Sequence, residues 1–235
     1  MTEGDSRLPP STLEEEPDAL RNSTGAPPFS HRGPEDALPS SPSTLREIYH
    51  AIHRDIEQWT KYSSDFSGSH LSWLRRISVF FLPSLQCCLL YRLSHWLHRL
   101  GWIGLSRCLW RINYLVHKCD ISPGARIGEG LYIPHTVGVI FHGHAGERTT
   151  LYARSIVVST QPHTDKTDVY DDCPLLGDNV TVGVCSVVQG AIHLAHGTFV
   201  GANVVLLADS PPNALYLHNN QSETRARTDL GKDTP

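Results

Sequence analysis

The sequence lacks the features that would mark a secreted or disulfide-bonded protein. Its six cysteines include no CxxC pair and follow no disulfide-like spacing. The first residues have neither the basic segment nor the apolar core of an export signal. Because disulfide frameworks belong to oxidising compartments, these absences predict a cytoplasmic protein.

The chain also lacks an excess of basic residues and a long hydrophobic run. Its formal charge of -4 gives no electrostatic bias toward nucleic acid. The most apolar stretch, 77–91, is interrupted by Pro83, Ser84 and Gln86 and is too short to span a bilayer. An interfacial role for this stretch stays open. With 40% hydrophobic residues, the composition is that of a soluble globular protein of one domain plus extensions.

The first part of the chain divides into a tail and a helical domain. Residues 1–42 are rich in Pro, Ser and acidic residues and predict a disordered tail. Thr44 and Glu47 resemble a capping box, and apolar residues then recur at spacings of three and four up to Trp59. Further helices are expected over 71–99, with a break or kink at Pro83, and over 103–116. The helical domain is therefore predicted to span 43–118.

A six-residue repeat runs through the second half of the chain. The repeated hydrophobic residues are Ile121, Ile127, Ile133, Val139 and, after a break, Leu176, Val182, Val188, Leu194, Val200 and Leu206. The residue four positions after each is usually small or aliphatic: Ala125, Leu131, Val137, Val180, Ser186, Ile192, Thr198 and Val204. A strict spacing of six fits neither a helix nor a single strand, and it predicts a parallel β-helix in which each hexad forms one side of a coil.

The same repeat sets the limits of this second domain. We expect the β-helix over 119–212 and a polar tail over 213–235. Residues 160–175 interrupt the repeat with polar residues and proline, so they are expected to leave the coils as a loop. Long loops on a rigid scaffold often carry function.

Two stretches resemble the serine acetyltransferase family of hexapeptide acyltransferases. They are YRLSHWLHRLG at 91–101 and CDISPGARIGEGLYIPHTVGV at 119–139, and the resemblance extends over about 44–212. It implies a helical N-terminal domain followed by a left-handed β-helix, an α+β fold. It also implies a homotrimer, with helical contacts that can pair two trimers, and acetyl-CoA as the acetyl donor. The implied reaction is O-acetylation of L-serine, which leads into cysteine synthesis.

His135 and Asp120 are the catalytic candidates. In the family, the matching histidine is the general base that takes the proton of the acceptor hydroxyl, which then attacks the thioester directly. The resemblance assigns that role to His135 and an orienting role to Asp120. Because three hexads take about 18 residues, a separation of 15 is expected to bring the two residues near one corner of adjacent coils. A carboxylate behind an imidazole fixes its tautomer.

The residues that bind serine in the family are mostly changed. Pro134 stands where the family has an acidic residue, and Cys173 and Asp172 stand where it has a second histidine and an arginine. A site that loses its partners for a charged substrate loses discrimination. A sugar or exopolysaccharide hydroxyl is therefore the alternative acceptor, and Cys173 either packs at the base of the loop or acts as a nucleophile. A third alternative is an inactive trimeric scaffold.

Acetyl-CoA is expected in the groove between neighbouring β-helices of the trimer. The candidate residues are Gly183, Ser186, Gly201, Ala202 and, in the loop, Lys166. Gly183 and Gly201 are 18 residues apart and should stack, either against the cofactor or only as corner glycines. Lys166 is alternatively a solvated surface charge.

Two further binding partners are not expected. His142 and His144 form an H-x-H pair, but no third residue stands at metal-ligand spacing, so no metal site is predicted. In the family, a C-terminal isoleucine inserts into a sulfhydrylase partner. This sequence ends in GKDTP, which argues against that partner.

Overall fold

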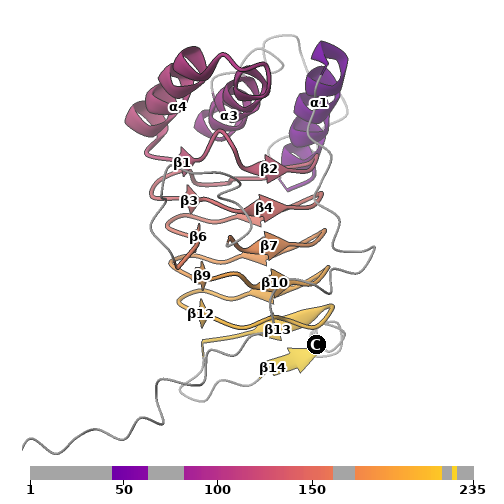
Figure 1. The fold of residues 1–235 in the computed structure, drawn as a ribbon. Coiled ribbons are helices and arrows are strands. Elements are labelled where there is room, and N and C mark those ends of the chain that lie inside the picture. The colour runs from indigo at the N-terminus through magenta and orange to yellow at the C-terminus, as the bar shows by residue number, and fades with distance from the viewer. Residues whose placement is uncertain (1–43, 63–81, 161–172, 219–223, 227–235) are drawn as a thin grey trace, which may run out of the picture. The chain divides into compact units, whose positions relative to one another are not determined.

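The computed structural model describes residues 44–62, 82–160 and 173–218, together with the backbone of 224–226. Residues 36–235 belong to one compact unit. The predicted tail over 1–42, the start of the second predicted helix and most of the predicted loop lie outside the described residues. The described part of the chain forms the helices α1, α3 and α4, followed by stacked coils of short strands (Figure 1).

Two of the predicted helices form as expected. Helix α1 spans Leu45–Tyr62 and α4 spans Ile103–His117. The predicted capping box is confirmed, because the Glu47 amide donates to Thr44 Oγ1 and the Thr44 amide donates to the Glu47 carboxylate, both at 3.3 Å.

Helix α3 spans Pro83–Arg99, so Pro83 begins this helix and does not kink it. Proline suits the first turn because it lacks the amide that would there have no partner. The helix ends at Gly101, whose φ of +81° is a conformation that glycine adopts without strain. The Trp102 amide donates to the Leu97 carbonyl and the Gly101 amide to the His98 carbonyl, which closes a Schellman motif before α4.

The predicted β-helix is confirmed as three parallel sheets, one for each side of the coil. Sheet A contains β1 (Asp120–Ile121), β3 (Ile140–Phe141), β6 (Ile156–Val158), β9 (Val187–Gln189) and β12 (Val205–Leu206). Sheet B contains β2 (Arg126–Ile127), β4 (His144–Ala145), β7 (Leu175–Leu176) and β10 (His193–Leu194). Sheet C contains β5 (Thr150–Leu151), β8 (Thr181–Val182), β11 (Phe199–Val200), β13 (Ala214–Tyr216) and β14 (Thr224–Ala226).

In the coils of regular length, stacked residues are 18 positions apart. Arg126 pairs with His144, Leu175 with His193 and Val187 with Val205. The repeated hydrophobic residue of each strand points inward and is almost fully buried, which gives the coils one continuous core. This core continues past the predicted end at residue 212, because β13 stacks in parallel on β11, and β14 then adds antiparallel to β13.

The predicted break in the repeat before Leu176 is too long. The repeat continues at Ala145, Leu151 and Val157, which have no exposed surface. The spacing of six is interrupted here. Phe141 stacks on Ile121, and the next inward residue, Ala145, follows after four positions in place of six. Val137, four positions after Ile133, lies outside the core, since 56% of its surface is exposed.

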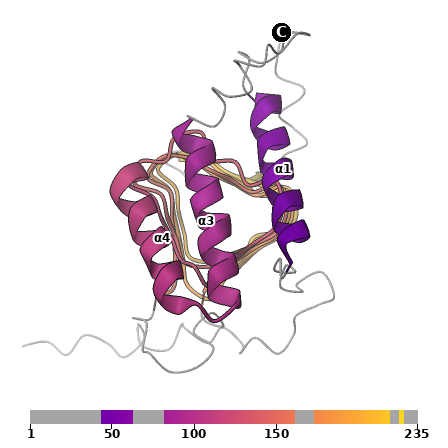
Figure 2. The ribbon, with the colours of Figure 1, turned by 90° about the horizontal axis from the view of Figure 1, so that it is seen from above.

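Helix α3 covers the open end of the coils (Figures 1 and 2). An end strand would leave carbonyl groups without partners, and side chains of α3 supply the missing donors. Tyr91 Oη donates to the Ala125 carbonyl at 2.9 Å, and Ser84 Oγ donates to the Ile133 carbonyl. The helices and the first coil are thus joined by hydrogen bonds as well as by packing.

A buried ion pair lies at the centre of this junction. Arg92 on α3 donates through Nε and Nη2 to both oxygens of Asp55 on α1, each at 2.9 Å. Its guanidinium also donates to the carbonyls of Ile127 and Gly128, and Asp55 accepts from the Leu131 amide. Burial alone lowers the pKa of Arg92, but the Asp55 carboxylate more than offsets that effect, so the pKa is raised.

No helix among the described residues is long and apolar enough to cross a membrane.

Replacing Asp55 with Asn should lower the free energy of unfolding by about 3–5 kcal/mol, because a buried arginine would lose its counter-charge. Urea denaturation followed by circular dichroism measures the change. The control is Glu57→Gln, which breaks the exposed Arg54–Glu57 pair and should change stability by no more than about 0.5 kcal/mol. Equal effects of the two changes would contradict the role of the buried pair.

His95 should make stability depend on pH. Its Nδ1 lies 2.8 Å from the Pro123 carbonyl, its Nε2 has no hydrogen-bond partner among the described residues, and burial lowers its pKa from 6.5 to about 4. The native state therefore favours neutral imidazole, and its contribution is complete above pH 6.5 and is lost as the pH falls toward 4. The loss should be roughly 3 kcal/mol. Denaturation at several pH values should show that the free energy of unfolding depends less steeply on pH in His95→Gln than in the parent protein. The control His218→Gln, at an exposed position, should leave the pH dependence of the parent unchanged.

Candidate active site

His135 lies on a protruding turn between sheets C and A. Tyr132 bridges to Thr150, and Ile140 pairs with Ile156, so this coil uses eight residues where the next coil uses six. The two extra residues make the chain project outward, and the His135 side chain is exposed. Gly138 closes the turn with a φ of +75°.

Asp120 lies on the outer face of sheet A with two hydrogen-bond donors. Trp110 Nε1 donates to its Oδ1 at 2.8 Å, and His142 Nε2 lies 3.3 Å from the same oxygen. Burial raises the pKa of the Asp120 carboxyl, but the contacts with His142 and Trp110 and the nearby charge of Arg111 outweigh it, so the pKa is lowered. Asp120 is therefore a carboxylate at neutral pH.

The structure pairs Asp120 with His142 and does not give it a hydrogen bond to His135. The predicted proximity of Asp120 and His135 depended on a coil of 18 residues. Asp120 instead stacks on Ile140, 20 positions away, because of the two extra residues in the turn. His142 follows Ile140 by two positions, and alternation along the strand directs it to the same outer face as Asp120. The pairing of Asp120 with His142 could be predicted from the sequence only if the length of this coil were already known.

The two histidines of the H-x-H pair have different surroundings. His142 is partly exposed beside Asp120, whereas His144 is buried and accepts a hydrogen bond at Nδ1 from the Arg126 amide at 3.2 Å. Among the residues that the structure describes, no three His, Cys, Asp or Glu side chains form a group that could hold a metal ion.

The predicted acceptor-binding residues are only partly described. Pro134 is half-buried next to His135, and Cys173 is 1% exposed. A thiol buried to this degree fits the expectation that Cys173 packs at the base of the loop. Asp172 and Lys166 lie outside the described residues.

The four predicted cofactor residues that the structure describes (Gly183, Ser186, Gly201 and Ala202) lie between the strands of sheets C and A, at the corner that also carries His135. A Cβ atom on Gly183 would lie 2.7 Å from the carbonyl carbon of Gly201, so the two glycines stack as expected and a side chain would not fit between them. Ala202 is exposed on this corner. Ser186 is fully buried and donates to the Gly183 carbonyl, so its hydroxyl is not available to a ligand in an outer groove.

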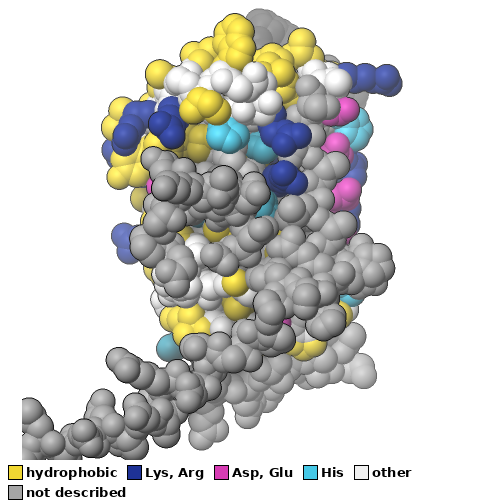
Figure 3. Space-filling model, in the orientation of Figure 1, with side chains coloured by type: hydrophobic (Ala, Val, Ile, Leu, Met, Phe, Trp, Pro, Cys, Tyr) yellow, Lys and Arg dark blue, Asp and Glu magenta, His cyan; other side chains and the backbone are white. Residues whose placement is uncertain are grey.

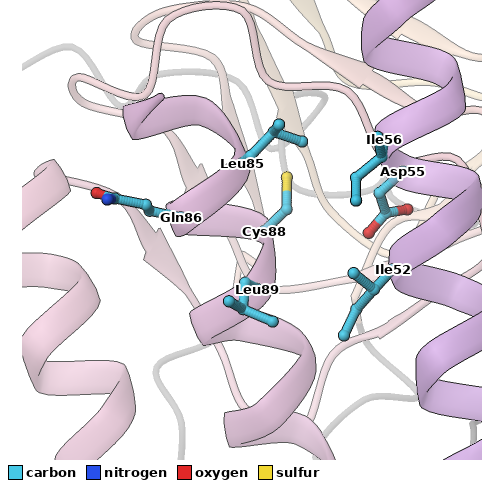
Figure 4. Close-up of a pocket in the computed structure, with 7 residues that line it drawn as sticks. All are labelled: Ile52, Asp55, Ile56, Leu85, Gln86, Cys88 and Leu89. Carbon is cyan, nitrogen blue, oxygen red and sulfur yellow. The ribbon is translucent and has the colours of Figure 1, made fainter. Parts of the chain in front are cut away.

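Two cavities lie elsewhere. The pocket in Figure 4 lies between α1 and α3, where Asp55 and Cys88 face the gap, but its volume of about 30 Å³ is too small for a substrate. Burial also raises the pKa of the Cys88 thiol. An open groove of about 500 Å³ runs between α1 and the loops that hold Glu129 and Glu147. Neither cavity is lined by His135 or Asp120.

Comparison with known proteins relates the whole arrangement to one family. The serine acetyltransferase of Helicobacter pylori is 34% identical over 131 residues, which covers 55% of this chain and 74% of the relative. The structure of Brucella abortus serine acetyltransferase in complex with coenzyme A has a TM-score of 0.66 at 20% identity, covering 77% of this chain and 69% of the other. Soybean serine acetyltransferase complexed with serine has a TM-score of 0.65 at 23% identity, covering 77% and 70%. No family model matches the chain.

Helices that cover the end of a parallel β-helix place the chain in the fold class of these solved structures. Within that class, the chain belongs to the serine acetyltransferase family.

The hydrogen bonds to Asp120 can be tested by titration. Trp110→Phe and His142→Ala should each raise the pKa of the Asp120 carboxyl, because each removes a donor that stabilises the carboxylate. Carbon-13 NMR of the carboxyl group measures this pKa. Trp102→Phe and His218→Ala, at exposed positions, are the matched controls. An unchanged pKa in His142→Ala would show that His142 does not bind Asp120.

Proposed function

We propose that the protein transfers the acetyl group of acetyl-CoA to the hydroxyl of L-serine, giving O-acetylserine and free CoA as an entry to cysteine synthesis in the cytoplasm. The observation that carries this proposal is membership of the serine acetyltransferase family, with His135 exposed at a coil corner. A related structure holds coenzyme A and another holds serine, which supports the choice of donor and acceptor.

His135 would act as the general base. Its imidazole takes the proton of the acceptor hydroxyl while the hydroxyl oxygen attacks the thioester carbonyl. The tetrahedral intermediate then collapses by breaking the carbon–sulfur bond, and the CoA sulfur leaves with the proton that the imidazole returns. No covalent enzyme intermediate is needed, which agrees with the burial of the Cys173 thiol.

Asp120 would stabilise the imidazolium that forms in this reaction. It is already a carboxylate in the structure, held by Trp110 and His142. A direct hydrogen bond to His135 would require the turn over 134–139 to move toward sheet A. His142, on the same outer face, would keep the carboxylate oriented until that contact is made.

The proposed assembly is a homotrimer of left-handed, hexapeptide-repeat β-helices, in which pairs of trimers can join through the helical domains. His135 and Ala202 are both exposed on the corner between sheets C and A. A neighbouring β-helix packed along this corner would turn an open surface into a groove. Such a groove would hold the pantetheine arm beside the exposed Ala202, whereas Gly183 and Gly201 are buried and serve as corner glycines that let the next coil approach.

A sugar hydroxyl is the second candidate acceptor. Pro134 beside His135 and the buried Cys173 provide no charge for the ammonium or carboxylate of serine. A neutral polyhydroxyl acceptor would need no such partners, and the same base chemistry would apply to it.

Thiol release from acetyl-CoA, measured with L-serine and with a panel of sugars, distinguishes the candidates. We expect turnover with serine, and a loss of about 10²–10⁴-fold in His135→Ala because the general base is removed. The matched control is His53→Ala, an exposed histidine on α1 outside the proposed site. Turnover only with a sugar would reassign the acceptor. Thiol release that does not depend on His135 would contradict the mechanism, and no turnover with any acceptor would favour the scaffold.

A further inference from the structure

Helix α4 has its polar side facing the protein. Its fully buried residues are Ser106, Asn113 and His117. Ser106 Oγ donates to the Ser94 carbonyl at 2.7 Å, and Asn113 Nδ2 donates to the Cys87 carbonyl at 3.1 Å. A helix on the surface of a soluble protein normally turns its apolar side inward, whereas α4 turns its polar side inward.

The outward side of α4 is apolar. We call it the α4 face and define it as Leu105, Ile112, Leu115 and Val116, which are 46%, 45%, 58% and 64% exposed. Spacings of seven and four put Leu105, Ile112 and Val116 along one line of the helix surface, and Leu115 lies beside that line on the side away from Ser106 and Asn113. Trp102 precedes the helix and is 63% exposed. Contiguous exposed apolar residues of this kind mark an interaction surface.

Cationic side chains border the α4 face. Residues 98–119 contain Arg99, Arg107, Arg111 and Lys118 but no Asp or Glu, in a chain whose formal net charge is -4. All four are exposed. Figure 3 shows hydrophobic and Lys or Arg side chains gathered over α4. Burial and the charges of Arg107 and Arg99 lower the pKa of His98, which shows how close together these groups lie.

The charge pattern decides between two ways of covering this face. If the α4 faces of two copies met, they would bring no acidic residue to the contact, so the arginines would find no counter-charge there. An anionic lipid surface matches both features, because it accepts apolar side chains below the headgroups and attracts Lys and Arg at their level. Tryptophan also favours this interface, where its ring is apolar and its N–H stays hydrated.

We propose that the α4 face is a docking surface for an anionic membrane, on which the helix lies in the plane of the headgroups. The stacked coils extend from the helical end of this unit (Figure 1). The protein would then be a peripheral enzyme of the cytoplasmic leaflet. This inference does not depend on the identity of the acceptor.

Vesicle flotation of the full chain tests the proposal. The vesicles contain phosphatidylcholine alone or with about one-third phosphatidylglycerol, which supplies the anionic surface. The apolar variant is Ile112→Ser with Leu115→Ser, and the charge variant is Arg99→Gln with Arg107→Gln. The control is Leu207→Ser, because Leu207 is 62% exposed on the coil that follows β12, away from α4. Circular dichroism verifies that each variant is folded.

We expect binding to the anionic vesicles only. The apolar variant should weaken it at least about tenfold, and the charge variant by about fivefold for each cation removed. Leu207→Ser should bind like the parent. Equal binding to both kinds of vesicle, no binding, or equal binding by all variants would overturn the proposal. Self-association in solution that the apolar variant abolishes, without vesicle binding, would instead assign the α4 face to a second copy.

Discussion

The contact between Arg92 and Asp55 connects α1, α3 and the first coil. Arg92 reaches from α3 to Asp55 on α1 and to two carbonyls of the first coil, while Asp55 accepts the Leu131 amide of that coil. All of these groups are buried, so none can exchange its partner for water at low cost. Three elements that are distant in sequence are therefore fixed in one geometry, and the first coil becomes a rigid base on which the later coils stack.

The stacked coils also restrict where the chain can gain or lose residues. Two extra residues enter the coil before Ile140, and two fewer follow before His144, so the register of sheets B and C is preserved. The insertion projects His135 into solvent and moves the neighbour of Asp120 from the predicted histidine to His142. The catalytic candidate thus stands on the insertion, where this coil departs outward from regular stacking. A protruding side chain at this point suits a site that a neighbouring copy would complete.

Much of the fold was predictable because its signals are local. The capping box at Thr44, the end of α3 at Gly101 and the buried residues of the later coils all follow from spacings of three, four or six. The repeat around Phe141 and Ala145 is not visible as a spacing of six, because this coil gains two residues before Ile140 and loses two before His144. Pro83 gave an ambiguous signal, since proline both breaks helices and begins them.

The sequence by itself determined the class of fold, the family and the two residues to examine first, because repeat spacing and motif order are properties of neighbouring residues. Only the tertiary structure decided that Asp120 binds His142 and Trp110, that Ser186 is buried, and that α4 turns Ser106 and Asn113 inward. The partner of a side chain depends on the exact length of a coil and on which element packs over it. Both are set by contacts between residues far apart in the chain, which local patterns do not encode.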